Sequence, residues 1–132
     1  MSGKQNRDSI VNTALLFLHS PYLWGGKTPF GIDCSGFTQV VYKINGYKLL
    51  RDAKDQATQG ETLSFIEESQ PGDLAFFHNK EDVIVHVGII LMDNHIIHAS
   101  GKVRIDRLDQ TGIYNNEKNT HTHYLRYIKK II

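Results

Sequence analysis

The spacing of apolar residues changes part-way along this chain, and that change limits the folds open to it. Up to Gly60 the apolar positions recur every three or four residues, as in helices that pack through one side. From Leu74 onward β-branched and apolar runs are bounded by turn residues, which is typical of strands. Helices followed by strands predict an α+β domain, with N-terminal helices packed on a C-terminal antiparallel β-sheet.

The ends of the expected elements follow from capping and turn residues. Asp8 or Ser9 is expected to cap the first helix, which should end at Ser20-Pro21. A glycine-rich loop then leads to a second helix that begins near Asp33 and closes at Asn45-Gly46. The remaining expected elements are a short helix over residues 53–59 and strands over residues 74–77, 83–92, 95–100, 103–108 and 124–131.

Length and charge narrow the class of protein. The 132 residues suffice for one compact domain, which we expect to cover residues 1–132. Fifteen basic and fourteen acidic residues give a formal net charge of +1 without charged blocks, so nucleic-acid binding is not indicated. The apolar runs are too short to cross a bilayer, and the polar first residues show no secretion signal.

The single cysteine, Cys34, lies in the segment Asp33-Cys34-Ser35-Gly36-Phe37. One thiol cannot form an internal disulfide, so its presence needs another explanation. At a helix N-terminus, unpaired amides and the helix dipole favour thiolate over thiol, which suits a nucleophile. A free cysteine is also a common small buried hydrophobe, and that interpretation stays open.

A cysteine nucleophile needs an imidazole base and a third polar group that orients the base. Among seven histidines, His86 is the best candidate because it interrupts an apolar run over residues 83–90, where an unpartnered ring would be costly. A core histidine bonded to a backbone carbonyl would look the same. Gly88 is expected to leave room for an approaching ligand.

The turn after this run decides whether His98 can assist His86. A two-residue turn would put the two rings on opposite faces of the sheet. A three-residue turn over residues 92–94 would instead place His98 opposite Gly88 and leave both rings on one face. We therefore expect an odd-length turn or a bulge, with His86 as the base and His98 accepting its other N–H.

Four short blocks make the interpretation specific. They are Pro21-Tyr22-Leu23-Trp24-Gly25-Gly26, Asp33-Cys34-Ser35-Gly36-Phe37, Pro71-Gly72-Asp73-Leu74, and His86-Val87-Gly88-Ile89 with Ile97-His98-Ala99. In this order they resemble the NlpC family of bacterial cell-wall cysteine peptidases, a papain-like group, over residues 21–99. Any one block recurs by chance, but four in order with one cysteine and two histidines form a strong signal.

The resemblance implies a role for each matching residue. Cys34 would be the nucleophile, His86 the base and His98 the third member of a catalytic triad. The backbone at Cys34 and the hydroxyl of Tyr22 would hold the oxyanion. No metal and no organic cofactor would be required.

Three further residues match positions near the substrate in relatives. Asp33 and Ser35 would meet the free amine of a stem peptide, although Asp33 is equally suited to be only a helix cap. Arg51 would pair with a substrate carboxylate, although a structural ion pair is the commoner use of an arginine. His95 and His98 point to opposite faces of a strand, so a zinc site is not expected.

The expected reaction is hydrolysis of the amide between γ-D-glutamate and a diamino acid, through a thioester, with peptidoglycan stem peptides or muropeptides as partners. A monomer is expected. The same triad could act on another amide, as an amidase or acyltransferase, and a non-catalytic wall-binding module is the alternative from another class. A thiol without a depressed pKa would favour that module. Localisation stays open between the cell envelope or periplasm, cytoplasmic recycling of wall peptides, and delivery by another route.

Overall fold

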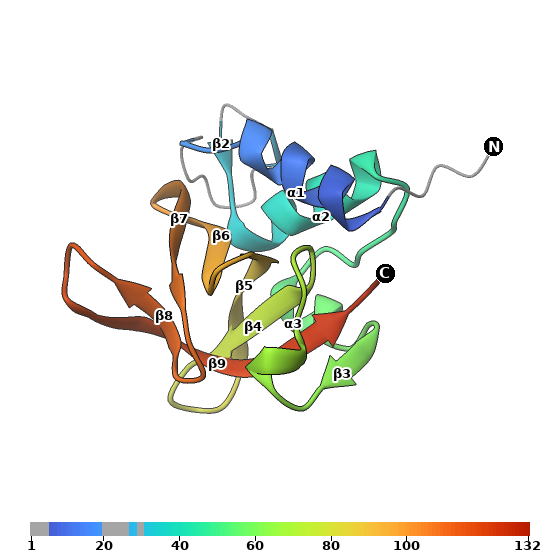
Figure 1. The fold of residues 1–132 in the computed structure, drawn as a ribbon. Helices are drawn as coiled ribbons and strands as arrows, with labels where there is room; N and C mark the ends of the chain where they lie inside the picture. The colour runs from blue at the N-terminus through green and yellow to red at the C-terminus, as the bar shows by residue number, and fades with distance from the viewer. Residues whose placement is uncertain (1–5, 20–26, 29–30) are drawn as a thin grey trace.

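A computed structural model describes residues 6–19, 27–28 and 31–132 of the chain (Figure 1). Its helical elements are α1 (Arg7–Leu16), α2 (Cys34–Ile44), α3 (Ala53–Gln56) and the 3-10 turn η1 (Ile66–Glu68). Its strands are β1 (Lys27–Thr28), β2 (Gly31–Ile32), β3 (Glu61–Leu63), β4 (Leu74–His78), β5 (Ile84–Leu91), β6 (His95–Ser100), β7 (Lys102–Leu108), β8 (Gly112–Asn115) and β9 (Thr120–Lys130). None of the described helices is long and apolar enough to span a bilayer.

The first helix differs at both ends from its expected bounds. Asn6, not Asp8 or Ser9, is the N-cap, and its side chain accepts a hydrogen bond from the backbone N–H of Ser9. An asparagine two residues earlier meets the same capping requirement, so sequence alone did not separate these candidates. The helix ends at Leu16 rather than at Ser20-Pro21, because the backbone N–H groups of Phe17 and Leu18 bond to carbonyls three residues back in a tighter turn.

The second helix has the predicted start and end. Asp33 is its N-cap, and the Asp33 carboxylate accepts a hydrogen bond of 2.6 Å from the backbone N–H of Gly36. Asn45 is the C-cap, and Gly46 follows with φ of +88°, a conformation that glycine adopts without strain. Phe37 and Val41 lie on its buried side, so the apolar face of α2 points into the core.

The strands form an antiparallel sheet that closes on itself. Within the described residues the strand order is β3-β9-β4-β5-β6-β7-β8, and β8 also pairs with β9. The strands from β4 to β9 therefore complete a ring, and β3 extends β9 on the outside. The short strands β3 and β8, and the hairpin of β1 and β2, were not expected because two to four residues give too little alternation to recognise.

Side chains on the two faces of this sheet build two separate clusters. One face shares a cluster with the helices, in which Phe37 of α2 packs with Phe76 of β4 and Val87 of β5. Figure 1 shows α1 and α2 side by side beyond one end of the strands. The other face encloses a second cluster inside the ring, lined by Phe77, Ile96, Leu108, Ile113 and Ile128 among others. The strands consequently present one face to the helices and the other to an enclosed interior.

Candidate active site

The only cysteine is the first residue of α2. Asp33 sets this position, because its carboxylate caps the helix. The backbone amides that follow Asp33 therefore lie at the N-terminus of α2. The Cys34 side chain is buried, with 9% of its surface exposed, in the cluster that includes Phe37 and Val87. The thiol therefore lies where α2 meets β5, beside the strand that carries His86.

Burial sets the charge state of this thiol. Loss of solvent raises the pKa of Cys34 above its ordinary value, and the negative charge of Asp33 also raises it. Hydrogen bonds from the backbone of Val87, Ser35 and Cys34 itself lower the pKa, but by less than burial raises it. The helix start thus acts in the expected direction, while the expectation of a resting thiolate is wrong because desolvation outweighs it.

The two histidines of β5 and β6 share one face, as the turn argument predicted. Leu91 pairs with His95 across a three-residue turn, and Gly88 pairs with His98. The expectation that Gly88 leaves room for a ligand is wrong. A Cβ at Gly88 would lie 2.9 Å from the His98 Cβ and 2.7 Å from Ile96 Cδ1, so neighbouring side chains already fill the space.

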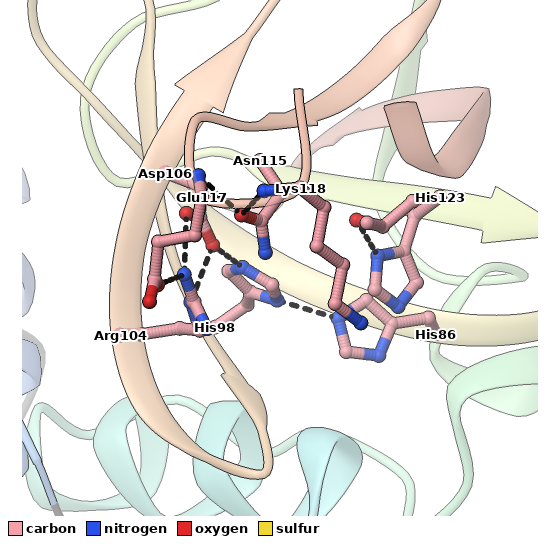
Figure 2. Close-up of polar contacts among 9 residues, drawn as sticks. His86, His98, Arg104, Asp106, Asn115, Glu117, Lys118 and His123 are labelled. Atoms are coloured by element: carbon pink, nitrogen blue, oxygen red, sulfur yellow. Dashed lines mark hydrogen bonds and ion pairs between the residues drawn. The ribbon is translucent and has the colours of Figure 1, made fainter. Parts of the chain in front are cut away.

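A chain of hydrogen bonds runs through His98 (Figure 2). Nε2 of His86 lies 2.8 Å from Nδ1 of His98. Nε2 of His98 lies 2.8 Å from Oδ2 of Asp106, on β7. Arg104 holds the same carboxylate through two contacts, from Nε to Oδ2 at 2.8 Å and from Nη2 to Oδ1 at 3.1 Å.

The carboxylate at the end of this chain determines where the protons are. Although burial acts to raise it, hydrogen bonds from His98 and Arg104 lower the pKa of Asp106, so this group is ionised and can only accept. His98 therefore carries its proton on Nε2. A neutral His98 then accepts at Nδ1, so His86 donates from Nε2 and keeps a lone pair on Nδ1.

Both histidines are neutral at rest because they are buried. Burial lowers the pKa of His86 well below its ordinary value, and the neighbouring His98 and His123 lower it further. Burial likewise lowers the pKa of His98, although Asp106 opposes this effect. The site consequently rests as a neutral thiol with neutral imidazoles.

A third histidine covers the ring of His86. His123 of β9 stacks on His86, with ring centroids 4.1 Å apart and planes 24° apart. Burial first, and then His98 and Lys118, lower the pKa of His123 to about 4 although Asp106 acts to raise it, so this ring is also neutral near pH 7. Phe77 approaches His86 at 5.8 Å between ring centroids. His86 is thereby held between ring neighbours in the orientation that the hydrogen bond to His98 requires.

The remaining candidates on the helix side contact one another. Arg51 Nη2 lies 2.8 Å from Asp33 Oδ2, and Arg51 Nη1 lies 2.9 Å from Ser35 Oγ. The side chain of Gln56 donates to the carbonyl of Ser35, and this contact ties the same segment to the start of α2. Asp33 is thus both the helix cap and the ion-pair partner of Arg51, whose side chain stays 34% exposed.

The thiol approaches the backbone of the strand that carries His86. The Val87 backbone, one residue after His86, hydrogen bonds to Cys34. Within the described residues, however, no hydrogen bond joins the thiol to the His86 ring, and none occupies His86 Nδ1. Catalytic hydrogen bonds are often long before a substrate binds. Tyr22, expected at the oxyanion, lies outside the described residues.

The imidazoles do not form a set of metal ligands. Nε2 of His86 and Nδ1 of His98 face each other at hydrogen-bond distance, which leaves no space for an ion between them. Among the described residues, no group of three or more histidine, cysteine, aspartate or glutamate side chains is arranged to hold a metal.

Sequence reasoning missed Asp106 and His123. Asp106 could have been found by extending the register argument across the next turn. Ser100 pairs with Lys102 around Gly101, so Arg104 and Asp106 fall on the same face as His98. His123 offered no comparable signal, because its place depends on β9 pairing with β8 across a register shift between Ile113 and Tyr114.

The sequence also matches known proteins. The sequence model of the NlpC/P60 family matches residues 19–123. A gamma-D-glutamyl-L-lysine dipeptidyl-peptidase of Bacillus subtilis (strain 168) is 40% identical over 119 residues, which cover 86% of this chain and 40% of that protein. Dipeptidyl-peptidase 6 of Lysinibacillus sphaericus is 38% identical over 109 residues, covering 79% of this chain and 37% of that protein. The chain therefore spans about two fifths of these relatives.

Solved structures give the same fold. An NlpC/P60 family protein from Bacillus cereus ATCC 10987 superimposes with a TM-score of 0.83 at 29% identity, covering 97% of this chain and 41% of that one. The NlpC/p60 domain of the peptidoglycan hydrolase SagA superimposes with a TM-score of 0.74 at 27% identity, covering 96% of this chain and 99% of that domain.

Proposed function

This chain belongs to the NlpC/P60 family of cell-wall peptidases, and from that premise we propose that it hydrolyses the γ-D-glutamyl–diamino acid amide of peptidoglycan stem peptides. Cys34 is the proposed nucleophile, His86 the base and His98 the residue that orients the base. Residues 1–132 would act as one papain-like catalytic domain. The Bacillus subtilis relative, named for γ-D-glutamyl-L-lysine, supports lysine as the diamino acid.

One observation carries the proposal: Nε2 of His86 lies 2.8 Å from Nδ1 of His98 on the neighbouring strand, while Cys34 lies against the backbone of the residue after His86. A nucleophile, a base and an orienting group are the three parts that cysteine acyl transfer needs. Here each part is supplied by a different element, α2, β5 and β6.

The proposed mechanism passes two protons through His86, one in each half of the reaction. As substrate binds, His86 Nδ1 takes the thiol proton and the sulfur attacks the amide carbonyl, so that a carbon–sulfur bond forms. Backbone amides at the start of α2, with the Tyr22 hydroxyl, hold the negative oxygen. The His86 imidazolium then protonates the leaving amine as the carbon–nitrogen bond breaks, which leaves a thioester.

Hydrolysis of the thioester reverses these roles. His86 Nδ1 removes a proton from water, and the resulting hydroxide attacks the thioester carbonyl. The carbon–sulfur bond breaks, and the thiolate recovers its proton from His86. The neutral resting pair suits this cycle, because proton transfer accompanies attack instead of preceding it.

The polar cluster at the start of α2 is the proposed site for the amino end of the substrate. Asp33 is buried and negatively charged, and Arg51 and Ser35 lie within hydrogen-bond distance of one another beside it. A substrate ammonium could share the Asp33 carboxylate, while the half-exposed Arg51 could shift toward a substrate carboxylate. This arrangement favours stem peptides with a free amine over intact wall, in which that amine is blocked.

The test uses defined peptides and mass spectrometry of their products. We expect wild-type protein to convert L-Ala-γ-D-Glu-L-Lys into L-Ala-D-Glu and lysine, and Cys34→Ala protein to leave it intact. The N-acetylated peptide is the matched substrate control, and its kcat/KM should be at least about tenfold lower if Asp33 meets the amine. Turnover by the Cys34→Ala protein would exclude the mechanism.

Burial of the thiol is the observation that favours a second candidate, a wall-binding module with an inert cysteine. That module would bind stem peptides without cleaving them, and Cys34→Ala would leave its affinity unchanged. Cleavage at a different amide, as by an amidase, would instead appear in the same spectra as different product masses. Product masses therefore separate the peptidase from the amidase, and binding of uncleaved peptide with equal affinity by wild-type and Cys34→Ala protein identifies the module.

A further inference from the structure

We propose that Asp106, held by Arg104, is a positioning residue that fixes the proton positions of both histidines and so directs a lone pair toward Cys34. The inference rests on the proposed function in one respect, that His86 is the base. It adds Asp106, and Arg104 as its support, to the proposed set of Cys34, His86 and His98.

The contacts of Asp106 leave it little freedom. Asp106 lies on β7 opposite Ile96, so its side chain points to the face of the sheet that carries His98. Oδ2 accepts from both His98 and Arg104, and Oδ1 accepts from Arg104. The Asp106 side chain is 7% exposed. Burying a carboxylate costs free energy unless its charge is paired, and here His98 and Arg104 both donate to it.

Two proton arrangements are possible for the bonded histidines. In one, His98 has its proton on Nε2, His86 has its proton on Nε2, and His86 Nδ1 is a base. In the other, His98 has its proton on Nδ1 and donates to His86 Nε2, which leaves the His86 proton on Nδ1. The second arrangement puts a proton on His86 Nδ1, so that this nitrogen cannot accept the thiol proton as the proposed function requires.

Asp106 selects the first arrangement. Its carboxylate has no proton to give, so His98 must present an N–H at Nε2. The same charge stabilises the imidazolium that forms on His86 during acylation, since His98 relays the interaction through two hydrogen bonds of 2.8 Å. Loss of the charge would remove both effects while leaving the three rings packed.

Arg104 and its neighbours set the charge around this relay. Arg104 also pairs with Glu117, at 2.8 Å, so the guanidinium bridges two carboxylates. Lys118 follows Glu117 in the turn between β8 and β9, and its positive charge reaches His123. Facing the relay are thus one buried carboxylate, one guanidinium, one lysine and the neutral His123 (Figure 2). Among these groups Asp106 is the one hydrogen bonded to His98, whereas His123 meets it ring to ring.

The test compares Asp106→Asn with Asp109→Asn. The second substitution is the matched control, because Asp109 also contacts a histidine, His121, but is joined to neither His86 nor His98. We expect Asp106→Asn to lower kcat by about 10- to 100-fold with KM within about twofold, since the effect falls on an orienting contact. Asp109→Asn should keep kcat within about twofold.

A spectroscopic readout makes the result independent of activity. In ¹⁵N NMR spectra at pH 7, wild-type His98 should be protonated on Nε2, and Asp106→Asn should show a mixture of forms or protonation on Nδ1. Arg104→Gln, which keeps the carboxylate but loosens it, should lower kcat by less than Asp106→Asn and preserve the wild-type tautomer.

Two outcomes would overturn the proposal. One is a wild-type His98 protonated on Nδ1, and the other is an Asp106→Asn protein that keeps both the wild-type tautomers and its kcat. If Asp106→Asn does not fold, the wild-type spectrum and Arg104→Gln decide in the same way. If the wild-type protein cleaves no stem peptide, the proposed function fails, while the tautomers still decide whether Asp106 orients the histidines.

Discussion

Two histidine–aspartate pairs in the sheet have contacts of similar length but differ in burial and in their other partners. We call His98–Asp106 the inner pair and His121–Asp109 the outer pair. Nε2 of His98 is 2.8 Å from Asp106, and Nε2 of His121 is 2.9 Å from Asp109. The first pair is 1% and 7% exposed, whereas the second is 27% and 45% exposed. A short contact between a ring and a carboxylate therefore does not identify a catalytic element.

The two pairs differ in the other contacts that each carboxylate and each ring makes. Asp109 accepts from the backbone N–H groups of Thr111 and Gly112, so its carboxylate shapes a turn. Although burial acts to raise it, His121 and these amides lower the pKa of Asp109. Asp106 instead binds side chains only, and His98 passes the contact on to His86. The inner pair therefore acts on which nitrogens of His98 and His86 carry protons, whereas the outer pair stabilises the turn between β7 and β8.

The largest expected effect comes from removing one ring of each pair. His98→Ala should lower kcat by about 10²- to 10³-fold, because His86 loses the group that orients it. His121→Ala should stay within about twofold of wild type. Steady-state hydrolysis of a γ-D-Glu-L-Lys peptide, with circular dichroism to verify folding, makes the comparison. Equal losses in the two variants would show that the inner pair has no special role.

Burial favours the neutral form of the Cys34 thiol, as it favours the neutral form of His86, and this gives the second prediction. Because burial raises the pKa of Cys34 and lowers that of His86, the resting pair is neutral. Alkylation by iodoacetamide should therefore speed up about tenfold per pH unit from pH 6 to 8, with no plateau. A plateau near neutrality that disappears in His86→Ala would instead reveal a thiolate–imidazolium pair.

A substitution at Gly88 should damage the inner pair, together with the packing of Ile96 beside it. The added Cβ of Gly88→Ala would meet His98 Cβ at 2.9 Å, so His98 has to move from its partners. We expect about 1–3 kcal/mol lower stability and at least about tenfold lower kcat. Gly101→Ala is the control, since its Cβ meets nothing within 4 Å and only its φ of +73° is strained. It should lose stability but keep kcat.

The smallest effect concerns acid stability. The pKa of His123 is lowered to about 4 in the fold, so the unfolded chain binds more protons below the ordinary value of about 6.5. The stability from this neutral ring is complete above pH 6.5 and is lost as pH falls toward 4. His123→Phe should remove about 1–2 kcal/mol of the stability that wild type loses between pH 7 and 5. Urea unfolding at both pH values measures it, and an unchanged loss would contradict the burial of His123.

Much of the fold follows from local sequence. The cap at Asp33, the end of α2 at Asn45 and the exact span of β6 depend on residues within one turn of each other, and these predictions are confirmed. The Asn6 cap and the short strands β3 and β8 were missed, because several capping residues compete at one end and a few residues show no periodicity. Closure of the ring depends on the pairing of β4 with β9, which joins segments far apart in the sequence, such as Leu74 and Lys129.

The predictions for the site divide in the same way, into local features that were predicted and long-range features that were missed. The parity of a three-residue turn placed His86 and His98 on one face, because alternation along a strand is a local property. The charge state of Cys34 was wrong, since burial comes from the whole fold and not from the helix that the thiol begins. His123 reaches His86 only through the ring of strands, and nothing near it in the sequence indicated that contact.

The tautomer of His86 in the ligand-free protein tests the central claim most directly. ¹⁵N NMR at pH 7 should show His86 protonated on Nε2 and unprotonated on Nδ1, the nitrogen that is to receive the Cys34 proton. A proton on Nδ1, whether in the other neutral tautomer or in an imidazolium, would contradict the account.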